Sequence, residues 1–235
     1  MDRMITIIVP VYNEEKGIAK FIECLRGVAP NETFELILVD GGSTDKTKQI
    51  CRDNDVKVYE SPQKGRARQM NFGAELASGD VLYFLHADSI PPENFVKDIQ
   101  RNIERGISSG CYQLAFDPNH ILLGVYSWFT RFDIDFFRFG DQSLFVKKED
   151  FLKSGGFNES LDVMEDQQIV KDLKKIGAFT IMDGTVKTSS RKYLENGVIK
   201  LQVIFAIIVL LYYLGVSQKI ITDFYSSQLR SVMKL

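Results

Sequence analysis

Short apolar runs alternate with helix-patterned segments through the first half of the chain. The run at residues 5–11 is almost continuously apolar, which is typical of a strand buried on both faces of a parallel sheet. Similar runs follow at residues 36–39, 56–59 and 81–85, and apolar residues recur at helical spacing over residues 18–27 and 67–77. This alternation predicts an α/β fold with a mostly parallel, Rossmann-like sheet and helices on both faces.

Polar residues stand where three of these strands end. Tyr12, Asn13 and Glu14 follow the first strand, Asp40 ends the second, and Asp88 comes shortly after the fourth. Ligands of parallel sheets bind at the carboxyl ends of the strands. We therefore expect these side chains to converge on one crevice.

The second half of the chain is less regular. Aromatic residues crowd residues 121–139, and short strands are expected at 144–146 and 179–182, with a helix at 166–176 between them. The segment 201–216 is strongly apolar but just short of the roughly 20 residues needed to span a bilayer. It can pack on the domain, pair with a second subunit, or lie at a membrane surface.

Charge and cysteine content restrict the class of protein. The formal net charge is -2, and the basic residues are scattered, which argues against a nucleic-acid-binding surface. The cysteines, Cys24, Cys51 and Cys111, match no zinc spacing. With no cleavable apolar leader in view, we expect a cytoplasmic protein, with peripheral placement at the inner face of the membrane as the alternative for segment 201–216.

Asp88 and His86 are candidate ligands of a divalent metal. Mg²⁺ takes only one or two protein carboxylates when phosphate oxygens and waters complete its shell, so a single strand-end aspartate is sufficient. His86 lies two residues before Asp88 and points to the same side of an extended strand, as a second ligand or a phosphate donor. A semi-buried structural histidine is the alternative.

Glu165 and Asp166 form an acidic pair at the start of an amphipathic helix. A helix N-terminus stabilises the ionised carboxylate, which keeps it available as a proton acceptor. Arg191 suits a leaving diphosphate, because its guanidinium matches phosphate geometry. Each is also an ordinary feature of a surface helix, and Asp40 is equally explained as a turn residue.

Six ordered motifs carry a family resemblance. They are Val-Pro-Val-Tyr-Asn-Glu at 9–14, Val-Asp-Gly-Gly-Ser-Thr-Asp at 39–45, Met-Asn-Phe-Gly-Ala at 70–74, Ser-Gly-Asp at 78–80, Leu-His-Ala-Asp at 85–88 and Glu-Asp at 165–166. The chain resembles the family-2 glycosyltransferases, in a compact bacterial branch, over roughly residues 4–190. The resemblance implies the A-type nucleotide-diphosphosugar-transferase fold and inverting transfer from a nucleotide-sugar with Mg or Mn as cofactor.

The resemblance also implies roles for individual residues. Asp166 would be the base that activates an acceptor hydroxyl, Asp88 the metal-binding carboxylate, and Asp141 and Gln142 would lie near the acceptor. The residues implied for nucleotide-sugar binding are Pro10, Tyr12, Asn13, Glu14, Asp40, Arg66, Asn71, His86, Ala87 and Arg191. Either Arg66 or Arg68 can meet phosphate. His86 departs from the family pattern, because it replaces the first aspartate of the Asp-x-Asp motif.

The implied organisation is a catalytic domain at 1–195 with a helical appendage at 196–235. Within the domain, 1–105 would be the nucleotide-binding half and 106–195 the acceptor half. The Gln-x-x-Arg-Trp signature of processive synthases is absent, so transfer of a single sugar is expected. The donor would be a nucleotide-sugar, with UDP the commonest nucleotide, and the acceptor a glycan, lipid or small molecule.

Two other functions are consistent with the sequence, and a third lacks the loop it requires. A polyprenyl-phosphate glycosyltransferase would use segment 199–216 as its membrane contact, whereas a homodimer would bury the same segment. A non-catalytic nucleotide-sugar-binding protein would explain the altered His86. A sugar-nucleotidyltransferase would need a glycine-rich, arginine-containing loop after the first strand, which this chain lacks.

Overall fold

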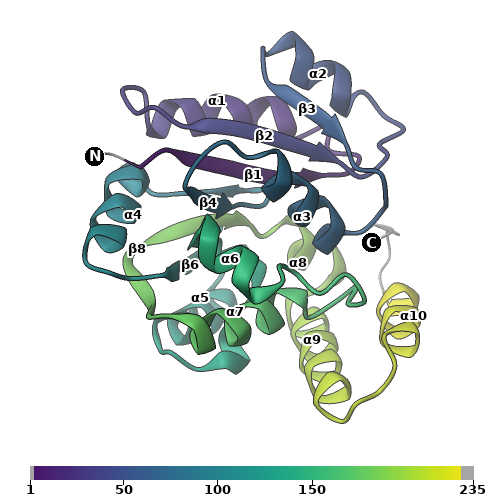
Figure 1. The fold of residues 1–235 in the computed structure, drawn as a ribbon. Helices are drawn as coiled ribbons and strands as arrows, with labels where there is room; N and C mark the ends of the chain where they lie inside the picture. Colours follow the sequence, from purple (N-terminus) through teal and green to yellow (C-terminus); the bar gives the residue numbers. More distant parts are fainter. Residues whose placement is uncertain (1–2, 229–235) are drawn as a thin grey trace.

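A computed structural model describes residues 3–228 and contains one mixed eight-stranded sheet in the order β3-β2-β1-β4-β7-β6-β8-β5 (Figure 1). The strands are β1 (Ile5–Val11), β2 (Glu35–Asp40), β3 (Lys57–Glu60), β4 (Val81–Phe84), β5 (Ser89–Ile90), β6 (Ser109–Asp117), β7 (Leu144–Lys147) and β8 (Phe179–Ser189). The α/β class expected from the sequence is confirmed.

Helices cover both faces of the sheet, and the last helices of the described chain follow its final strand, β8. They are α1 (Ile18–Val28), α2 (Thr47–Asp53), α3 (Arg66–Leu76), α4 (Phe95–Glu104), α5 (Ile121–Trp128), α6 (Lys148–Ser154), α7 (Glu165–Ile176), α8 (Arg191–Asn196), α9 (Val198–Tyr213) and α10 (Gln218–Gln228). Single 3₁₀ turns are η1 (Phe129–Arg131), η2 (Asp135–Phe137) and η3 (Gly140–Gln142).

Strands β3, β2, β1 and β4 are parallel, so their carboxyl ends share one edge of the sheet. Val11 pairs with Asp40, and Ile8 pairs with Phe84, which sets the ends of β1, β2 and β4 side by side. The core on one face includes Ile5, Phe21 and Leu25, and that on the other includes Ile8, Met70 and Leu173. The sequence pattern predicted this half within one or two residues at each boundary.

Helix α3 packs very closely on the sheet because Gly73 has no side chain. A Cβ on Gly73 would lie 2.4 Å from Ile8 Cγ2. One turn earlier, the Gln69 amide donates to the carbonyls of Val11 at 3.0 Å and Val39 at 2.7 Å. These contacts fix the first turn of α3 at the carboxyl ends of β1 and β2.

The second half of the sheet contains β7, β6, β8 and β5, and most of its strand pairs are antiparallel. β7 pairs antiparallel with β4 and with β6, and β6 pairs in parallel with β8. β6 falls in residues 106–142, where the sequence predicted no element. The predicted strand at 179–182 continues to Ser189, because β8 follows β6 past a register shift at Tyr112 and Gln113.

The carboxyl-terminal helices share a core with the preceding domain. Leu201, Ile204 and Ile208 of α9 belong to one buried cluster with Leu114 of β6 and Tyr225 of α10. Figure 1 shows α9 and α10 at the lower right of the molecule, after the segment 1–195 that the sequence analysis expects to be the catalytic domain. No helix within residues 3–228 is long and apolar enough to cross a membrane.

Candidate active site

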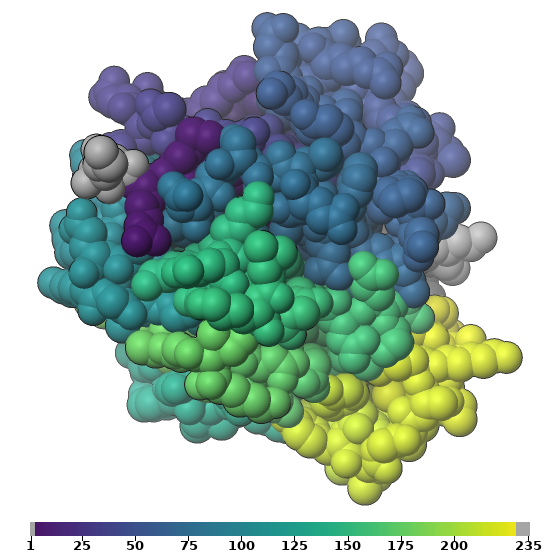
Figure 2. Space-filling model, viewed as in Figure 1, coloured from purple at the N-terminus to yellow at the C-terminus, as the bar shows by residue number. Residues whose placement is uncertain are grey.

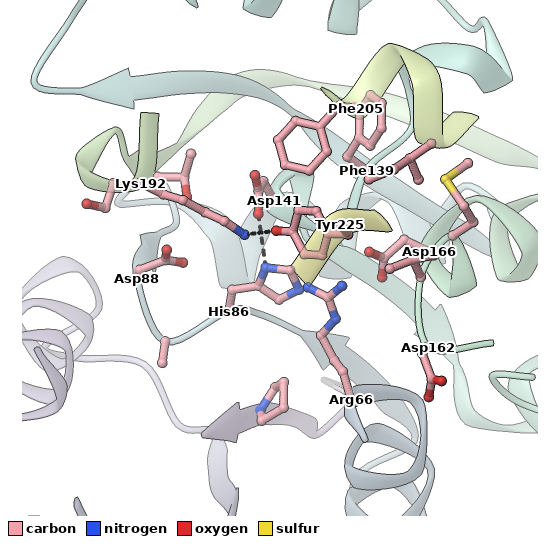
Figure 3. A pocket seen from close by; sticks show the side chains of 18 of the residues that line it. Arg66, His86, Asp88, Phe139, Asp141, Asp162, Asp166, Lys192, Phe205 and Tyr225 are labelled. Carbon is pink, nitrogen blue, oxygen red and sulfur yellow. Dashed lines mark hydrogen bonds and ion pairs between the residues drawn. The ribbon is translucent and has the colours of Figure 1, made fainter. Parts of the chain in front are cut away.

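A pocket of about 320 Å³ lies at the carboxyl ends of β1 and β4 (Figure 3). Its polar half is lined mainly by residues of the first and middle segments, namely Pro10, Tyr12, Glu14, Arg66, Gln69, His86, Ala87, Asp88, Asp141, Asp166, Arg191 and Lys192. Its apolar half is lined by Tyr126, Phe139, Val163, Met164, Tyr193, Phe205, Ile208, Val209 and Tyr225. The strand-end crevice predicted from the sequence is present, and helices α8 to α10 close its other side.

Glu14 faces the pocket from the loop that follows β1. Its backbone N–H donates to Thr47 Oγ1 at 2.8 Å, and its carbonyl accepts from Ile18 at the start of α1. Burial, and next the nearby charge of Asp88, raises the pKa of Glu14 to about 7. Arg191, which also lines the pocket, acts in the opposite direction and lowers the pKa of Glu14.

Asp88 presents its carboxylate to solvent inside the pocket. Burial within the surrounding protein, followed by the charge of Asp141, raises the pKa of Asp88 above its ordinary value. Ser89 Oγ lies 3.4 Å from the carboxylate, and no lysine or arginine of residues 3–228 lies within ion-pair distance of it. A cation from outside the chain would relieve this repulsion.

His86 is hydrogen-bonded to Asp141 of η3, with 3.1 Å between Nδ1 and Oδ1. Burial opposes the charged imidazole, but the bond to Asp141 raises the pKa of His86. Burial likewise opposes ionisation of Asp141, and the bond to His86 lowers the pKa of Asp141 below its ordinary value. The pair keeps both groups oriented at the centre of the pocket, as Figure 3 shows.

The available donors fit a divalent metal only if a ligand supplies oxygens. No group of three or more His, Cys, Asp or Glu side chains among the described residues is arranged to hold a metal alone. Asp88 offers a free carboxylate, and Mg²⁺ or Mn²⁺ readily combines one such ligand with phosphate oxygens and water. His86 Nδ1 already bonds Asp141, which leaves Asp88 as the principal protein donor.

The first turn of α7 sends its two acidic side chains to different places. Met164, directly before it, has a left-handed backbone with φ of 72°. Glu165 points into the core, where its Oε1 lies 2.5 Å from Arg66 Nε. Asp166 points into the pocket. Of the two acidic residues proposed from the sequence as catalytic, only Asp166 can reach a bound substrate.

Gly140 brings Asp166 and His86 together. A Cβ on this glycine would lie 2.5 Å from Asp166 Oδ2 and 2.7 Å from His86 Cε1. Both side chains therefore pack directly on the backbone of η3. The turn acts as a spacer between the helix that carries Asp166 and the strand end that carries His86.

Several site residues expected from the sequence have structural roles instead. Gln142, expected near the acceptor, is buried, does not line the pocket, and its amide donates to the Tyr112 carbonyl at 3.1 Å. Asn71 bonds the backbone of Phe157 in both directions, at 2.9 Å each, and does not line the pocket. Both amides hold loops in place.

Asn13 and Asp40 act in the same way at the ends of β1 and β2. Asn13 Oδ1 accepts from the Thr44 backbone at 2.9 Å. Asp40 Oδ2 accepts from the backbones of Gly42 and Ser43, and the residue is fully buried outside the pocket lining. The turn interpretation of Asp40 is therefore the better one. Glu165 is the remaining misassigned residue, because it is buried against Arg66.

The two candidate arginines, Arg66 and Arg68, differ in position relative to the pocket. Arg66 lines the pocket, whereas Arg68 donates to the Lys64 carbonyl and lies 3.9 Å from Asp162. Arg191, at the start of α8, also lines the pocket as expected. Arg66 is thus the arginine of the 65–71 segment that can meet a bound anion.

Sequence reasoning missed Lys192 and the whole apolar half of the pocket. Lys192 donates to the hydroxyl of Tyr225 in α10, and its ammonium lies 5.7 Å from the ring centre of Phe205 in α9. The one sequence signal for the apolar half was the long apolar run in α9, which lacks a polar side to face water. Its register against the pocket depends on tertiary packing that no local pattern reveals.

A sequence model described as glycosyl transferase family 2 matches residues 6–149. The chain belongs to that family. Among curated relatives, glycosyltransferase GlyG of Streptococcus pneumoniae is 32% identical over 112 residues, covering 44% of this chain and 36% of the relative. Glycosyltransferase AglE of Haloferax volcanii is 36% identical over 115 residues, covering 45% of this chain and 34% of the relative. The match spans about a third of these relatives.

Solved structures of TarS and of the mannosyltransferase PcManGT share the fold of this chain. Residues 1–349 of TarS from S. aureus give a TM-score of 0.66 at 18% identity, covering 86% of this chain and 65% of TarS. The mannosyltransferase PcManGT from Pyrobaculum calidifontis, solved with GDP-Man and Mn²⁺, gives a TM-score of 0.70 at 17% identity, covering 90% and 63%. These similarities confirm the A-type glycosyltransferase fold expected from the sequence.

Proposed function

We propose that this protein transfers a single sugar from a nucleotide-diphosphate sugar to an acceptor hydroxyl with inversion at the anomeric carbon. The observation that carries the proposal is the joint presence of Asp88 and Asp166 in one pocket at the strand ends of a family-2 chain. Asp166 accepts the proton of the acceptor hydroxyl as the oxygen attacks. The sugar–phosphate bond breaks on the opposite side, so the configuration inverts.

The nucleotide occupies the half of the site built by residues 1–105. Pro10, Tyr12 and Glu14 line its wall, and His86 and Ala87 lie at its inner end. UDP-sugars are the first donors to test, because the relative structures include complexes with UDP, UDP-GlcNAc and GDP-Man. The acceptor half comprises residues 106–195 together with α9 and α10, since these helices line the same pocket.

Positively charged groups around Asp88 would neutralise the negative charge of the leaving diphosphate. A divalent Mg or Mn ion held by Asp88 and the donor's own oxygens would neutralise part of this charge when bound. Arg66 and Arg191 bring guanidinium groups to the same cavity, where they bind phosphate oxygens. Against the effect of burial, the bond to Asp141 raises the pKa of His86, and a protonated His86 would add positive charge to the same cavity.

Replacement of Asp166 tests the proposal. Asp166→Asn should lower transfer by about 100- to 10,000-fold, because it removes the general base. The variant should still bind UDP or GDP nearly as well as the wild type, which a thermal-shift assay with and without Mn²⁺ measures. Asp172→Asn on the same helix is the matched control, since Asp172 pairs with Lys175 outside the pocket. Wild-type transfer by Asp166→Asn would exclude Asp166 as the base.

A purely binding function makes a different prediction. A non-catalytic nucleotide-sugar-binding protein would be stabilised by the donor but would neither transfer the sugar nor hydrolyse the donor. We therefore include a donor-hydrolysis assay without acceptor. Measurable metal-dependent hydrolysis that Asp88→Asn abolishes supports the enzyme.

Transfer to a polyprenyl phosphate at a membrane is the second candidate, and α9 favours it. Helix α9 exposes Ile199, Val203 and Leu210, and Leu214 directly after it is exposed too, so an apolar helix is left partly uncovered. At its end, Lys171 lies 4.4 Å from the ring centre of Tyr213, a pairing suited to an anionic lipid surface. Cosedimentation with anionic vesicles would support peripheral placement at a membrane surface, whereas a concentration-dependent homodimer would support burial of the same apolar surface in a dimer.

A further inference from the structure

We propose that Gln218, the first residue of α10, is a positioning residue for the proposed base, Asp166. Its side chain holds the segment that leads into α7, and α7 carries Asp166 into the pocket. The inference rests on the proposed function, because Gln218 acts through Asp166. It adds a residue that lies outside residues 6–149, the part of the chain that the family model matches.

The side-chain oxygen of Gln218 bridges two consecutive backbone groups. Oε1 accepts from the N–H of Asp162 and from the N–H of Val163, at 3.2 Å each. A backbone N–H can only donate, so the oxygen of this amide faces the segment and its nitrogen points elsewhere. Asp162 and Val163 both line the pocket. One side chain of α10 thus fixes two peptide groups just before the proposed base.

The chain enters α7 through a backbone conformation that needs support. Met164 has φ of 72°, in the left-handed region that residues other than glycine rarely adopt. Its carbonyl accepts from the backbone of Gln168 at 3.1 Å, which starts the helix. Asp166 belongs to this first turn, so the direction of its side chain follows the orientation of the turn. Restraint of Asp162 and Val163 therefore restrains where Asp166 points.

One side of α10 faces the site. Gln218, Ile221 and Tyr225 recur along it at helical spacing. Ile221 and Tyr225 are buried in the same cluster as Met164. Tyr225 also lines the pocket, and its hydroxyl accepts from Lys192 (Figure 3). In Figure 2 the yellow carboxyl-terminal segment lies directly against the green segment that precedes α7. α10 is therefore attached to the site at its first turn and again two turns later.

Lys192 finds its partners within the protein at this second attachment. Its ammonium donates to Tyr225 and lies 5.0 Å from the ring centre of that tyrosine. It also faces Asp141: burial opposes ionisation of this carboxyl group, but the bond to His86 and, less strongly, the charge of Lys192 lower its pKa. An ammonium balanced in this way needs no ligand for its charge, so it can hold α10 in place before a donor arrives.

Helix α9 holds α7 at a different place. The Tyr212 hydroxyl donates to Gln168 Oε1 at 2.7 Å. Gly215, with φ of 74°, then ends α9 and lets the chain turn back toward α10. α9 thus fixes the body of α7, whereas Gln218 fixes its entry. Loss of the Gln218 oxygen should therefore misplace Asp166 without releasing the helix.

Donor hydrolysis measures this role without a known acceptor. UDP-GlcNAc and GDP-mannose are supplied with Mn²⁺, and the faster donor is used. The water oxygen bonds to the anomeric carbon, the sugar–phosphate bond breaks, Asp166 takes the proton and the nucleoside diphosphate leaves. Gln218→Met lacks the acceptor oxygen, so kcat should fall about 10- to 100-fold while KM for the donor and Tm stay near the wild-type values. Gln218→Glu keeps an acceptor oxygen and should restore most of the rate.

A control and a double variant separate positioning from a general structural role. Lys219→Met places the same side chain at the exposed neighbouring position and should hydrolyse the donor as the wild type does. If Gln218 acts through Asp166, adding Gln218→Met to Asp166→Asn should cause no further loss. Hydrogen exchange needs no activity: the amides of Asp162 and Val163 should exchange faster in Gln218→Met than in Lys219→Met.

Three results would overturn the inference. One is a wild-type kcat in Gln218→Met, and another is a full additional loss when that change is added to Asp166→Asn. The third is unchanged exchange at Asp162 and Val163, which decides alone if the wild type hydrolyses neither donor. If Gln218→Met misfolds, Gln218→Asn replaces it, since its oxygen is one methylene short of the segment. Hydrolysis at the wild-type rate by Asp166→Asn would instead contradict the proposed function.

Discussion

Arg66 Nε lies 2.5 Å from Glu165 Oε1, and this ion pair joins the first turn of α3 to the first turn of α7. Arg66 belongs to the half proposed to hold the nucleotide, and Glu165 directly precedes the proposed base, Asp166. Glu165 is fully buried, whereas about a third of the Arg66 side chain is exposed to the pocket. The guanidinium can therefore serve a ligand on one side while it fixes α7 on the other.

Removal of Arg66 should destabilise the protein and weaken donor binding together. In Arg66→Met, Glu165 keeps its burial but loses its partner, so we expect a loss of about 1–3 kcal/mol in the free energy of unfolding. Urea denaturation measures this loss, and UDP titration measures the second effect. Arg68→Met on the same helix is the control, because Arg68 lies outside the pocket lining. Normal nucleotide affinity in Arg66→Met would show that its only role is structural.

Glu14 should make the protein less stable as pH rises toward neutrality. Burial raises its folded-state pKa from 4.5 to about 7, so between these values the folded chain holds a proton that the unfolded chain has released. The stability that this proton provides is complete below the lower value and is lost as pH rises through the upper one. Melting temperatures across this interval should fall more steeply for the wild type than for Glu14→Gln. Parallel curves would mean that Glu14 titrates normally.

Gly140→Ala should impair catalysis more than folding. The added methyl would lie 2.5 Å from Asp166 Oδ2 and 2.7 Å from His86 Cε1, so both side chains must move. A displacement of this order can lower turnover by about 100-fold. Gly124→Ala in α5 is the matched control, since its nearest neighbour would be 3.8 Å away. Steady-state kinetics and a melting curve of each variant separate the two effects.

Asp88→Asn should abolish the dependence of donor binding on a divalent ion. The wild type should bind UDP more tightly with Mn²⁺ than with a chelator, because Asp88 and the diphosphate would share the ion. The variant should bind UDP equally in both buffers. Asp80→Asn, at the opposite end of β4, provides the control. If the wild type is itself indifferent to Mn²⁺, His86 and the arginines meet the diphosphate without a metal.

The parallel half of the fold could be predicted from the sequence because its signals are local. The run at residues 5–11 and the helical pattern from Ile18 to Leu25 need no distant contact to be recognised. β6 could not be predicted in this way, because it owes its position to β8, which lies some 70 residues later in the chain. The same dependence explains why β8 extends beyond the predicted four residues.

The candidate site shows the same division between local and distant information. Asp88, Asp166, Glu14 and Arg191 were placed correctly in a pocket because strand ends and helix starts are readable positions. Gln142, expected near the acceptor, is buried beside the pocket, and its direction could not be predicted because a polar residue in an irregular loop gives no sign of where it points. Lys192 could not be assigned, because its partners arrive from two helices that follow it in the chain.

Gln69 has a consequence for the electrostatics beneath a bound diphosphate. The carbonyl oxygens at the ends of parallel strands carry partial negative charge, and those of Val11 and Val39 both accept from the Gln69 amide. A neutral side chain thus offsets part of the negative potential of two backbone dipoles without adding a charge of its own. The backbone beneath an anionic ligand would then repel it less, and the ligand's affinity would depend mainly on the cationic side chains that line the pocket.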